Sequence, residues 1–296
     1  MKSFKRMYSA IFFLLLMVTL PMTGVQDSLF NKVLSKKILR IGISENYPPL
    51  SFKTDKNKFD GIEIEMAKSF TTFLEGILSG GETKNSNKTT LNKPIISLEW
   101  VLVKPDNYVA KVKNHEVDLL LGGVSRNMSR SQQMWFSEPY YTFTPAVLFD
   151  RHKLPQAKYG EFFEERTYRT LWDLKNLKNI KLAVKTGSVY EELIQTRLPN
   201  AVIVKVDTND IGLNKLKARQ VDGFVHDSIF FDSKMREEPN FHGNFILLKG
   251  GNRKEVLCIG LPMGDTVWLQ TVNAWLAEVK RDGQLENWIR KYTEGN

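Results

Sequence analysis

The nine residues AKVKNHEVD at 110–118 recur as NKLKARQVD at 214–222, an internal repeat with a constant offset of 104 residues. Each copy has the pattern of a helix end that leads into an apolar strand, at 119–121 and at 223–225. Glycine or polar residues follow both strands, and ligands of open α/β sheets bind just beyond the carboxyl ends of the strands. We therefore expect two similar α/β lobes that face one ligand cleft. The alternative is chance similarity between two unrelated strand–helix–strand units.

Composition sets the limits for this interpretation. The chain has 296 residues, of which 42% are hydrophobic and 25% charged, so it is able to bury a core and to form one large or two ordinary domains. Its formal net charge of +9 could attract nucleic acid or anionic lipid. The lysines are interspersed with acids rather than clustered with aromatic residues, so we expect no nucleic-acid partner.

The first 25 residues have the layout of a secretory signal peptide. Lys2, Lys5 and Arg6 precede an apolar run at 10–20, and small and polar residues follow it. The run is too short to span a membrane, although a retained anchor helix is the alternative. We expect cleavage of residues 1–25 and a soluble mature protein in the periplasm.

Cysteine usage agrees with this expectation. The single cysteine, Cys258, lies in an apolar run that predicts a buried strand thiol, so no disulfide can form within the chain. No cysteine lies near the end of the leader to carry an acyl anchor. The mature protein is therefore expected to diffuse freely rather than to be lipid-anchored.

Local patterns outline the first lobe. Residues 39–44 predict a buried strand that stops at the rigid turn Tyr47-Pro48-Pro49. From Gly61, apolar residues recur at helical spacing, and the charged residues of this helix, Glu63 among them, are predicted to form a solvated face. Residues 79–93 predict an exposed loop.

Beyond the first repeat, the chain resembles the periplasmic binding proteins for polar amino acids, relatives of the histidine, glutamine and lysine-arginine-ornithine receptors of bacterial transporters. An arginine six residues before a Phe-Ser-x-Pro-Tyr segment is the most specific feature. The matching stretches occur in family order and span nearly the whole mature chain: Tyr47-Pro48-Pro49, 61–67, Val117-Asp118, Arg130 with 136–140, Trp172-Asp173-Leu174, Gly187-Ser188, Val221-Asp222 with Asp227, and Asp282-Gly283.

The resemblance implies a type II periplasmic binding protein fold of the α/β class, with a ligand cleft between two lobes. Lobe one is expected to comprise residues 37–146 and 254–296, and lobe two residues 147–253. Two hinge strands are expected to cross between the lobes near 143–150 and 250–256. The resemblance also implies an amino acid ligand, an inner-membrane ABC transporter permease as partner, a monomer and no cofactor. Helical stripes of apolar residues are expected to return the C-terminal segment to lobe one as core packing: Trp268, Val272, Trp275, Leu276 and Val279, then, after Gly283, Leu285, Trp288, Ile289 and Tyr292.

An α-amino acid carries a carboxylate that favours a planar double donor, which arginine supplies and lysine supplies poorly. Arg130 matches the family's carboxylate-binding arginine; Arg126 is a local competitor, and either could be a surface cation. Backbone donors are expected at Ser125 from lobe one and at Ser188 or Val189, where a predicted helix begins.

The ligand's ammonium requires an ionised acceptor, and Asp227 matches the family's ammonium-binding aspartate. Asp227 could instead cap the helix that follows it. Tyr47 matches the family's stacking aromatic residue, although a tyrosine in such a turn can serve packing alone. Gly123 is also a predicted contact, at a position where relatives often carry Ser or Thr.

Other functions have weaker support in the sequence. The four histidines show no metal-ligand spacing, and neither a nucleophile elbow nor a phosphate-binding loop is present. We expect a non-enzymatic protein. The main alternative is a periplasmic cyclohexadienyl dehydratase, because some proteins of similar sequence eliminate water and carbon dioxide from prephenate or arogenate, and His226 beside Asp227 could act as the acid. Ser44 replaces an acid that some receptors for basic amino acids use, and Glu45 is adjacent but out of register, so a cationic ligand stays open without being indicated.

Overall fold

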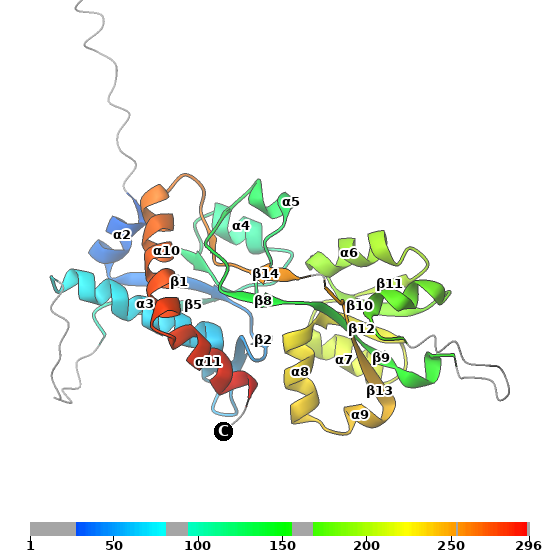
Figure 1. The fold of residues 1–296 in the computed structure, drawn as a ribbon. Helices are drawn as coiled ribbons and strands as arrows, with labels where there is room; N and C mark the ends of the chain where they lie inside the picture. The colour runs from blue at the N-terminus through cyan, green and yellow to red at the C-terminus, as the bar shows by residue number, and fades with distance from the viewer. Residues whose placement is uncertain (1–27, 81–93, 156–167, 253, 295–296) are drawn as a thin grey trace, which may run out of the picture.

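Two α/β lobes lie side by side in the computed structural model, which describes residues 28–80, 94–155, 168–252 and 254–294 (Figure 1). The central sheet of lobe one has the strand order β5-β1-β6-β15-β7. Strands β5 (Ser97–Leu102), β1 (Ile38–Ile43) and β6 (Leu119–Leu120) are parallel. Strand β15 (Gly260–Leu261) runs antiparallel to β6 and to β7 (Trp135–Phe136).

The sheet of lobe two repeats this arrangement, with the order β11-β10-β12-β9-β13. Strands β11 (Val202–Val206), β10 (Lys181–Lys185) and β12 (Gly223–Asp227) are parallel. Strand β9 (Pro145–Asp150) is antiparallel to β12 and to β13 (Phe245–Lys249). The three parallel strands of each lobe have the same relative order, which confirms the two-lobed α/β prediction.

The internal repeat also has matching backbone geometry. Its first copy joins α4 (Tyr108–Lys113) to β6, and its second joins α7 (Asn209–Lys217) to β12. His115 and Arg219, 104 residues apart, both have positive φ, of 54° and 55°. The carboxylates of Asp118 and Asp222 each accept a backbone N–H bond from the neighbouring strand, from Arg40 at 2.8 Å and from Lys181 at 2.7 Å. Each repeat therefore connects a helix to a central strand in the same way.

Helices cover both sheets. Those of lobe one are α2 (Leu29–Lys36), α3 (Ile62–Leu78), α4, α5 (Met128–Ser131), α10 (Thr266–Arg281) and α11 (Gln284–Thr293). Those of lobe two are the 3-10 turns η1 (Arg151–Lys153) and η2 (Leu171–Asn176), then α6 (Val189–Arg197), α7, α8 (Ser228–Glu237) and α9 (Phe241–Asn244). A small antiparallel sheet of β2 (Asn46–Tyr47), β3 (Ser51–Lys53) and β4 (Phe59–Asp60) extends lobe one.

Two short strands connect the lobes. Strand β8 (Tyr141–Phe143) pairs antiparallel with β14 (Glu255–Leu257) and leads into β9 (Figure 1). The expected first crossing at 143–150 lies slightly downstream of β8, because residues 145–150 form a complete strand inside the second sheet. The expected second crossing at 250–256 overlaps β14.

The C-terminal helices pack on lobe one, as the apolar stripes predict. Trp268, Val272, Trp275, Leu276 and Val279 are all buried. The indole of Trp268 donates to the carbonyl of Asp118 at 2.9 Å, so this tryptophan joins α10 to the end of the first repeat. These residues form part of the core.

Of four further predictions, one is wrong, one is confirmed and two lie wholly or mostly outside the described residues. Glu63 was expected on a solvated face, but it is fully buried and the expectation is wrong. The thiol of Cys258 is buried, as predicted, and burial raises its pKa to about 11. The signal peptide at 1–25 and most of the loop at 79–93 lie outside the described residues. Within the described ranges, no helix is long and apolar enough to cross a membrane.

Candidate functional site

The predicted contacts meet at a small cavity between the lobes, with a volume of about 30 Å³. This volume suffices for water but not for an amino acid. The lining residues come from both lobes: Tyr47, Pro105, Tyr108, Gly123, Ser125 and Arg130 from lobe one, and Lys185, Ser188, Val189, Tyr190 and His226 from lobe two. The structure thus places six of the seven predicted site residues on one cavity, and Asp227 follows the lining residue His226.

Arg130 is positioned from both lobes. Its backbone N–H donates to the Asn127 side chain at the start of α5. Its guanidinium donates to the carbonyl of Ser125 at 3.0 Å and, across the cleft, to the carbonyl of Gly187 at 3.1 Å. The guanidinium also lies 5.3 Å from the ring centre of Tyr108.

No carboxylate forms an ion pair with Arg130 among the described residues, although its exposed fraction is only 8%. A buried cation without a counter-ion carries a desolvation cost that an anionic ligand would offset. Two of the five guanidinium N–H donors are occupied by carbonyls, so donors remain for a carboxylate. Arg126 is exposed, which leaves Arg130 as the buried candidate.

Asp227 ends strand β12 and caps helix α8. Its Oδ1 accepts the backbone N–H of Phe230 at 2.8 Å, so the capping role that the sequence left open is present. Its Oδ2 is buried without a hydrogen-bond partner among the described residues. Burial raises the pKa of Asp227 to about 8, so the carboxyl is mostly protonated at neutral pH.

His226 cannot neutralise Asp227 by donating a proton. Its Nδ1 lies 3.1 Å from Asp227 Oδ2, but this nitrogen already accepts the backbone N–H of Asp227 at 2.9 Å. Burial, with a smaller contribution from Lys185, holds the pKa of His226 well below its usual range. One oxygen of Asp227 therefore stays available for a cationic group.

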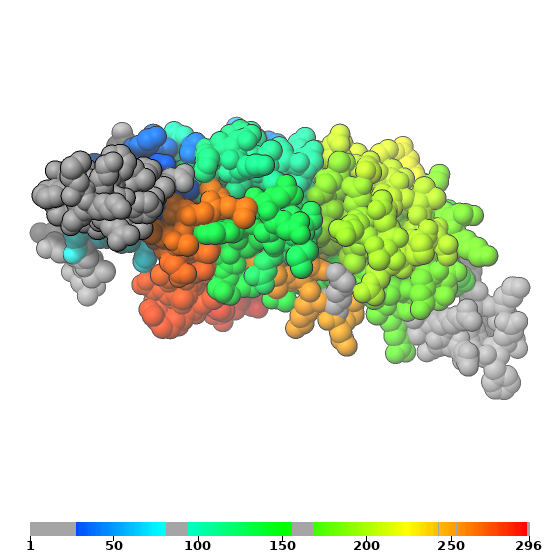
Figure 2. Space-filling view, turned by 90° about the horizontal axis from the view of Figure 1, so that it is seen from above, coloured from blue at the N-terminus to red at the C-terminus, as the bar shows by residue number. Residues whose placement is uncertain are grey.

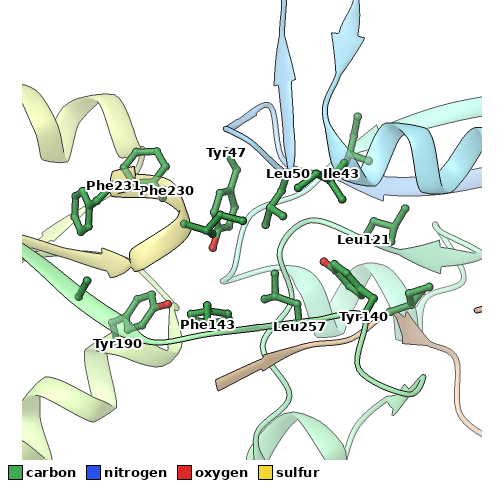
Figure 3. Packing of buried hydrophobic residues seen from close by; sticks show 14 of the residues in the cluster. Ile43, Tyr47, Leu50, Leu121, Tyr140, Phe143, Tyr190, Phe230, Phe231 and Leu257 are labelled. Carbon is green, nitrogen blue, oxygen red and sulfur yellow. The ribbon is translucent and has the colours of Figure 1, made fainter. Parts of the chain in front are cut away.

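Gly123 allows Tyr47 to lie against the backbone. Gly123 has φ of +67°, and a Cβ atom there would lie 2.2 Å from Cε1 of Tyr47. The Tyr47 ring meets the His226 ring edge-on at a centroid distance of 4.8 Å. It also meets the Phe230 ring at a centroid distance of 6.2 Å (Figure 3). Glycine in place of Ser or Thr thus gives space to an aromatic residue that contacts the other lobe.

Glu63 binds the backbone of the lining residue Gly123, a role that the sequence pattern did not predict. Its Oε1 accepts the backbone N–H of Gly123 at 2.8 Å and the hydroxyl of Tyr140. Burial raises the pKa of Glu63 to about 7. The first turn of α3 points toward the site, and helical periodicity by itself cannot show this.

The lobe-two wall is the start of helix α6. Val189 is its first residue, where backbone N–H groups lack intrahelical acceptors. The N–H of Ser188 donates to the Lys185 carbonyl at 3.1 Å, while Ser188 Oγ is buried without a partner among the described residues. The donor at Ser188 is thus occupied in this structure, and the one at Val189 is the better candidate.

The lobes touch directly beside the cavity. Asn209 Nδ2 donates to the Asn46 carbonyl at 2.9 Å, and Asn46 Nδ2 donates to Asp210 Oδ2 at 2.7 Å. The space-filling view shows the two lobes meeting at their surfaces (Figure 2). With the Arg130–Gly187 bond, these contacts hold the lobes together around the cavity.

In the part of the chain that the structure describes, no three His, Cys, Asp or Glu side chains cluster closely enough to hold a metal ion.

Comparison of the sequence with known protein families shows to which family this chain belongs. The sequence profile of bacterial extracellular solute-binding proteins, family 3, matches residues 39–295. The chain belongs to this family. The L-cystine-binding protein TcyJ of Escherichia coli strain K12 is 24% identical to this family 3 protein, over 90% of this chain and 86% of TcyJ. The arginine-binding extracellular protein ArtP of Bacillus subtilis is 22% identical, over 94% of each chain.

One relative of this family 3 protein is an enzyme. Cyclohexadienyl dehydratase of Pseudomonas aeruginosa is 23% identical, over 80% of this chain and 76% of the enzyme. Among solved structures, the ancestral amino acid-binding protein AncCDT-1, a precursor of cyclohexadienyl dehydratase, has a TM-score of 0.70 at 21% identity and covers 90% of this chain and 100% of its own. A histidine-bound substrate-binding protein of an ABC uptake transporter from Streptococcus pneumoniae has a TM-score of 0.72 at 18% identity, with coverages of 92% and 98%. These structures confirm the fold class.

Proposed function

We propose that this family 3 protein captures an amino acid or a closely related small solute between its lobes and delivers it to an ABC transporter permease of the inner membrane. The observation that carries the proposal is Arg130, a buried guanidinium with no counter-ion among the described residues. A ligand carboxylate would supply that counter-ion through charge-assisted hydrogen bonds.

Asp227 completes the proposal from the second lobe. Within the described parts of the chain its buried Oδ2 has no hydrogen-bond partner, and the ammonium of an amino acid would provide one. Arg130 and Asp227 come from different lobes, so a zwitterion bonds to both only when the lobes are together. The ligand therefore binds the closed form better and shifts the population toward it.

A ligand screen tests the function. Thermal unfolding is measured with each of the twenty L-amino acids and with ornithine, citrulline and glutathione. A ligand that binds only the folded protein at a hundredfold excess over its Kd should add about 2.7 kcal/mol to the free energy of unfolding. The decarboxylated analogue of the best ligand is the control. No stabilisation by any of these solutes would contradict the proposal.

The dehydratase alternative is resolved with the same protein preparation. His226 lines the cavity, Asp227 follows it in the chain, and one relative is a cyclohexadienyl dehydratase. We propose binding without turnover, because most of the relatives reported above bind solutes. Formation of phenylpyruvate from prephenate, or of phenylalanine from arogenate, would contradict binding without turnover and favour the dehydratase.

Export is the remaining part of the proposal. The family is described as extracellular, and we propose that this protein acts in the periplasm as a monomer without a lipid anchor. Secretion should cut the chain between Gly24 and Ser28. N-terminal sequencing of the exported protein checks the cut, and a mature chain that still begins at Met1 would contradict it.

A further inference from the structure

Lys185 is a second buried cation at the site, and the sequence pattern did not single it out. It is the last residue of strand β10, and its exposed fraction is 8%. Among the described residues, its ammonium forms no hydrogen bond or ion pair. It lines the small cavity with Arg130 and also lines a larger groove of about 860 Å³ between the lobes. Lys185 thus lies at both the cavity and the groove.

Lys185 is buried, whereas the acids that line the groove beside it are all exposed to solvent: Glu45, Asp55, Asp207, Asp210 and Glu237. Asp106 and Asp210 act on it at longer range, but both are exposed to solvent, and Lys104 opposes them. Burial lowers the pKa of Lys185 to about 8, a value that still leaves the amine mostly protonated at pH 7. Asp227 is mostly neutral at that pH in the absence of ligand. Among the described residues, neither of the buried cations Arg130 and Lys185 forms an ion pair with a carboxylate.

We propose that Lys185 selects amino acids whose side chain carries a carboxylate and rejects those with a cationic side chain. The inference rests on the proposed function, because it takes the α-carboxylate to lie at Arg130 and the α-ammonium at Asp227. Those two contacts leave Lys185 without a counter-ion, and a side-chain carboxylate would supply it. A guanidinium or ammonium placed there would add like-charge repulsion in a site shielded from water.

The groove gives such a side chain room to extend. Asn107, Thr208 and Asn209 line it beside Lys185. The buried Oδ1 of Asn209 has no hydrogen-bond partner among the described residues. A preference for a side-chain carboxylate would distinguish this protein from its relative ArtP, which is named an arginine-binding protein and is 22% identical.

Calorimetry with three ligands tests the proposal. L-glutamate, its uncharged isostere L-glutamine and cationic L-arginine are titrated into the full mature protein at pH 7. We expect glutamate to bind at least tenfold more tightly than glutamine, and arginine to bind more weakly than both. Lys185→Met should remove the preference for glutamate over glutamine, and Lys185→Glu should shift the preference toward arginine.

Lys181→Met is the matched control, because Lys181 begins the same strand and is exposed. It should leave the order of the three affinities unchanged. The proposal is overturned if wild type binds arginine as tightly as glutamate, or if Lys185→Met keeps the glutamate preference. If no amino acid binds, the proposed function fails as well; if amino acids bind without selection by charge, only the role of Lys185 fails.

Discussion

Arg130→Lys is expected to weaken binding of the best amino acid between about 10-fold and about 100-fold while the protein stays folded. Each charge-assisted hydrogen bond contributes about 1.5–3 kcal/mol, and a lysine ammonium cannot present two parallel donors to a carboxylate. The substitution would also break the bonds from Arg130 to the carbonyls of Ser125 and Gly187. Binding should therefore lose both a ligand contact and a bond that holds the lobes together.

Isothermal titration calorimetry measures the loss, and circular dichroism checks that the variant is folded. Arg126→Lys provides the matched control, since Arg126 is exposed four residues earlier in the chain. It should bind like wild type. Unchanged affinity in Arg130→Lys would show that the carboxylate lies elsewhere.

Asp227→Asn is expected to lower affinity by a similar factor and to remove a pH dependence of binding. In the ligand-free protein, burial raises the pKa of Asp227 to about 8, so its carboxyl is mostly protonated at pH 7. A ligand ammonium favours the ionised form, so binding must release a proton. Affinity should rise as the pH increases from 6 to 8 and level off above that range.

The raised pKa of Asp227 also predicts how the stability of the ligand-free protein changes with pH. Ionisation of buried Asp227 is less favourable in the ligand-free folded protein than in the unfolded chain. The contribution of this group to stability is therefore full below about pH 4 and declines as the pH rises toward 8. Ligand should offset this decline, because the ammonium pairs with the ionised carboxylate.

Asparagine retains an oxygen that can cap α8, so Asp227→Asn should fold as wild type does. Proton release is measured by calorimetry at pH 7 in buffers of different ionisation enthalpy. Glu63→Gln serves as the comparison, because the pKa of Glu63 is about 7 and its titration could otherwise account for the effect. Proton release that persists in Asp227→Asn but disappears in Glu63→Gln would reassign the proton to Glu63.

The sequence by itself determined the two-lobed plan. The repeat at 110–118 and 214–222 implies two similar units, and both have the strand–helix connections that it predicts. The helical spacing of apolar residues in α10 likewise predicts that its tryptophans lie in the core. These signals are local in the chain, because hydrophobic periodicity and turn residues act over a few neighbouring positions.

Only the tertiary structure decided the environment of each polar group in the site. Glu63 has the spacing of a surface residue, yet it is buried because Gly123 and Tyr140 lie against the first turn of α3. Lys185 ends an ordinary strand, yet it is buried beside a cavity that residues of both lobes line. Asp227 both caps α8 and keeps one oxygen without a hydrogen-bond partner in the described ranges, a combination that depends on how α8 packs. Burial and hydrogen bonding of these side chains depend on residues far away in the sequence, and no local pattern encodes those distances.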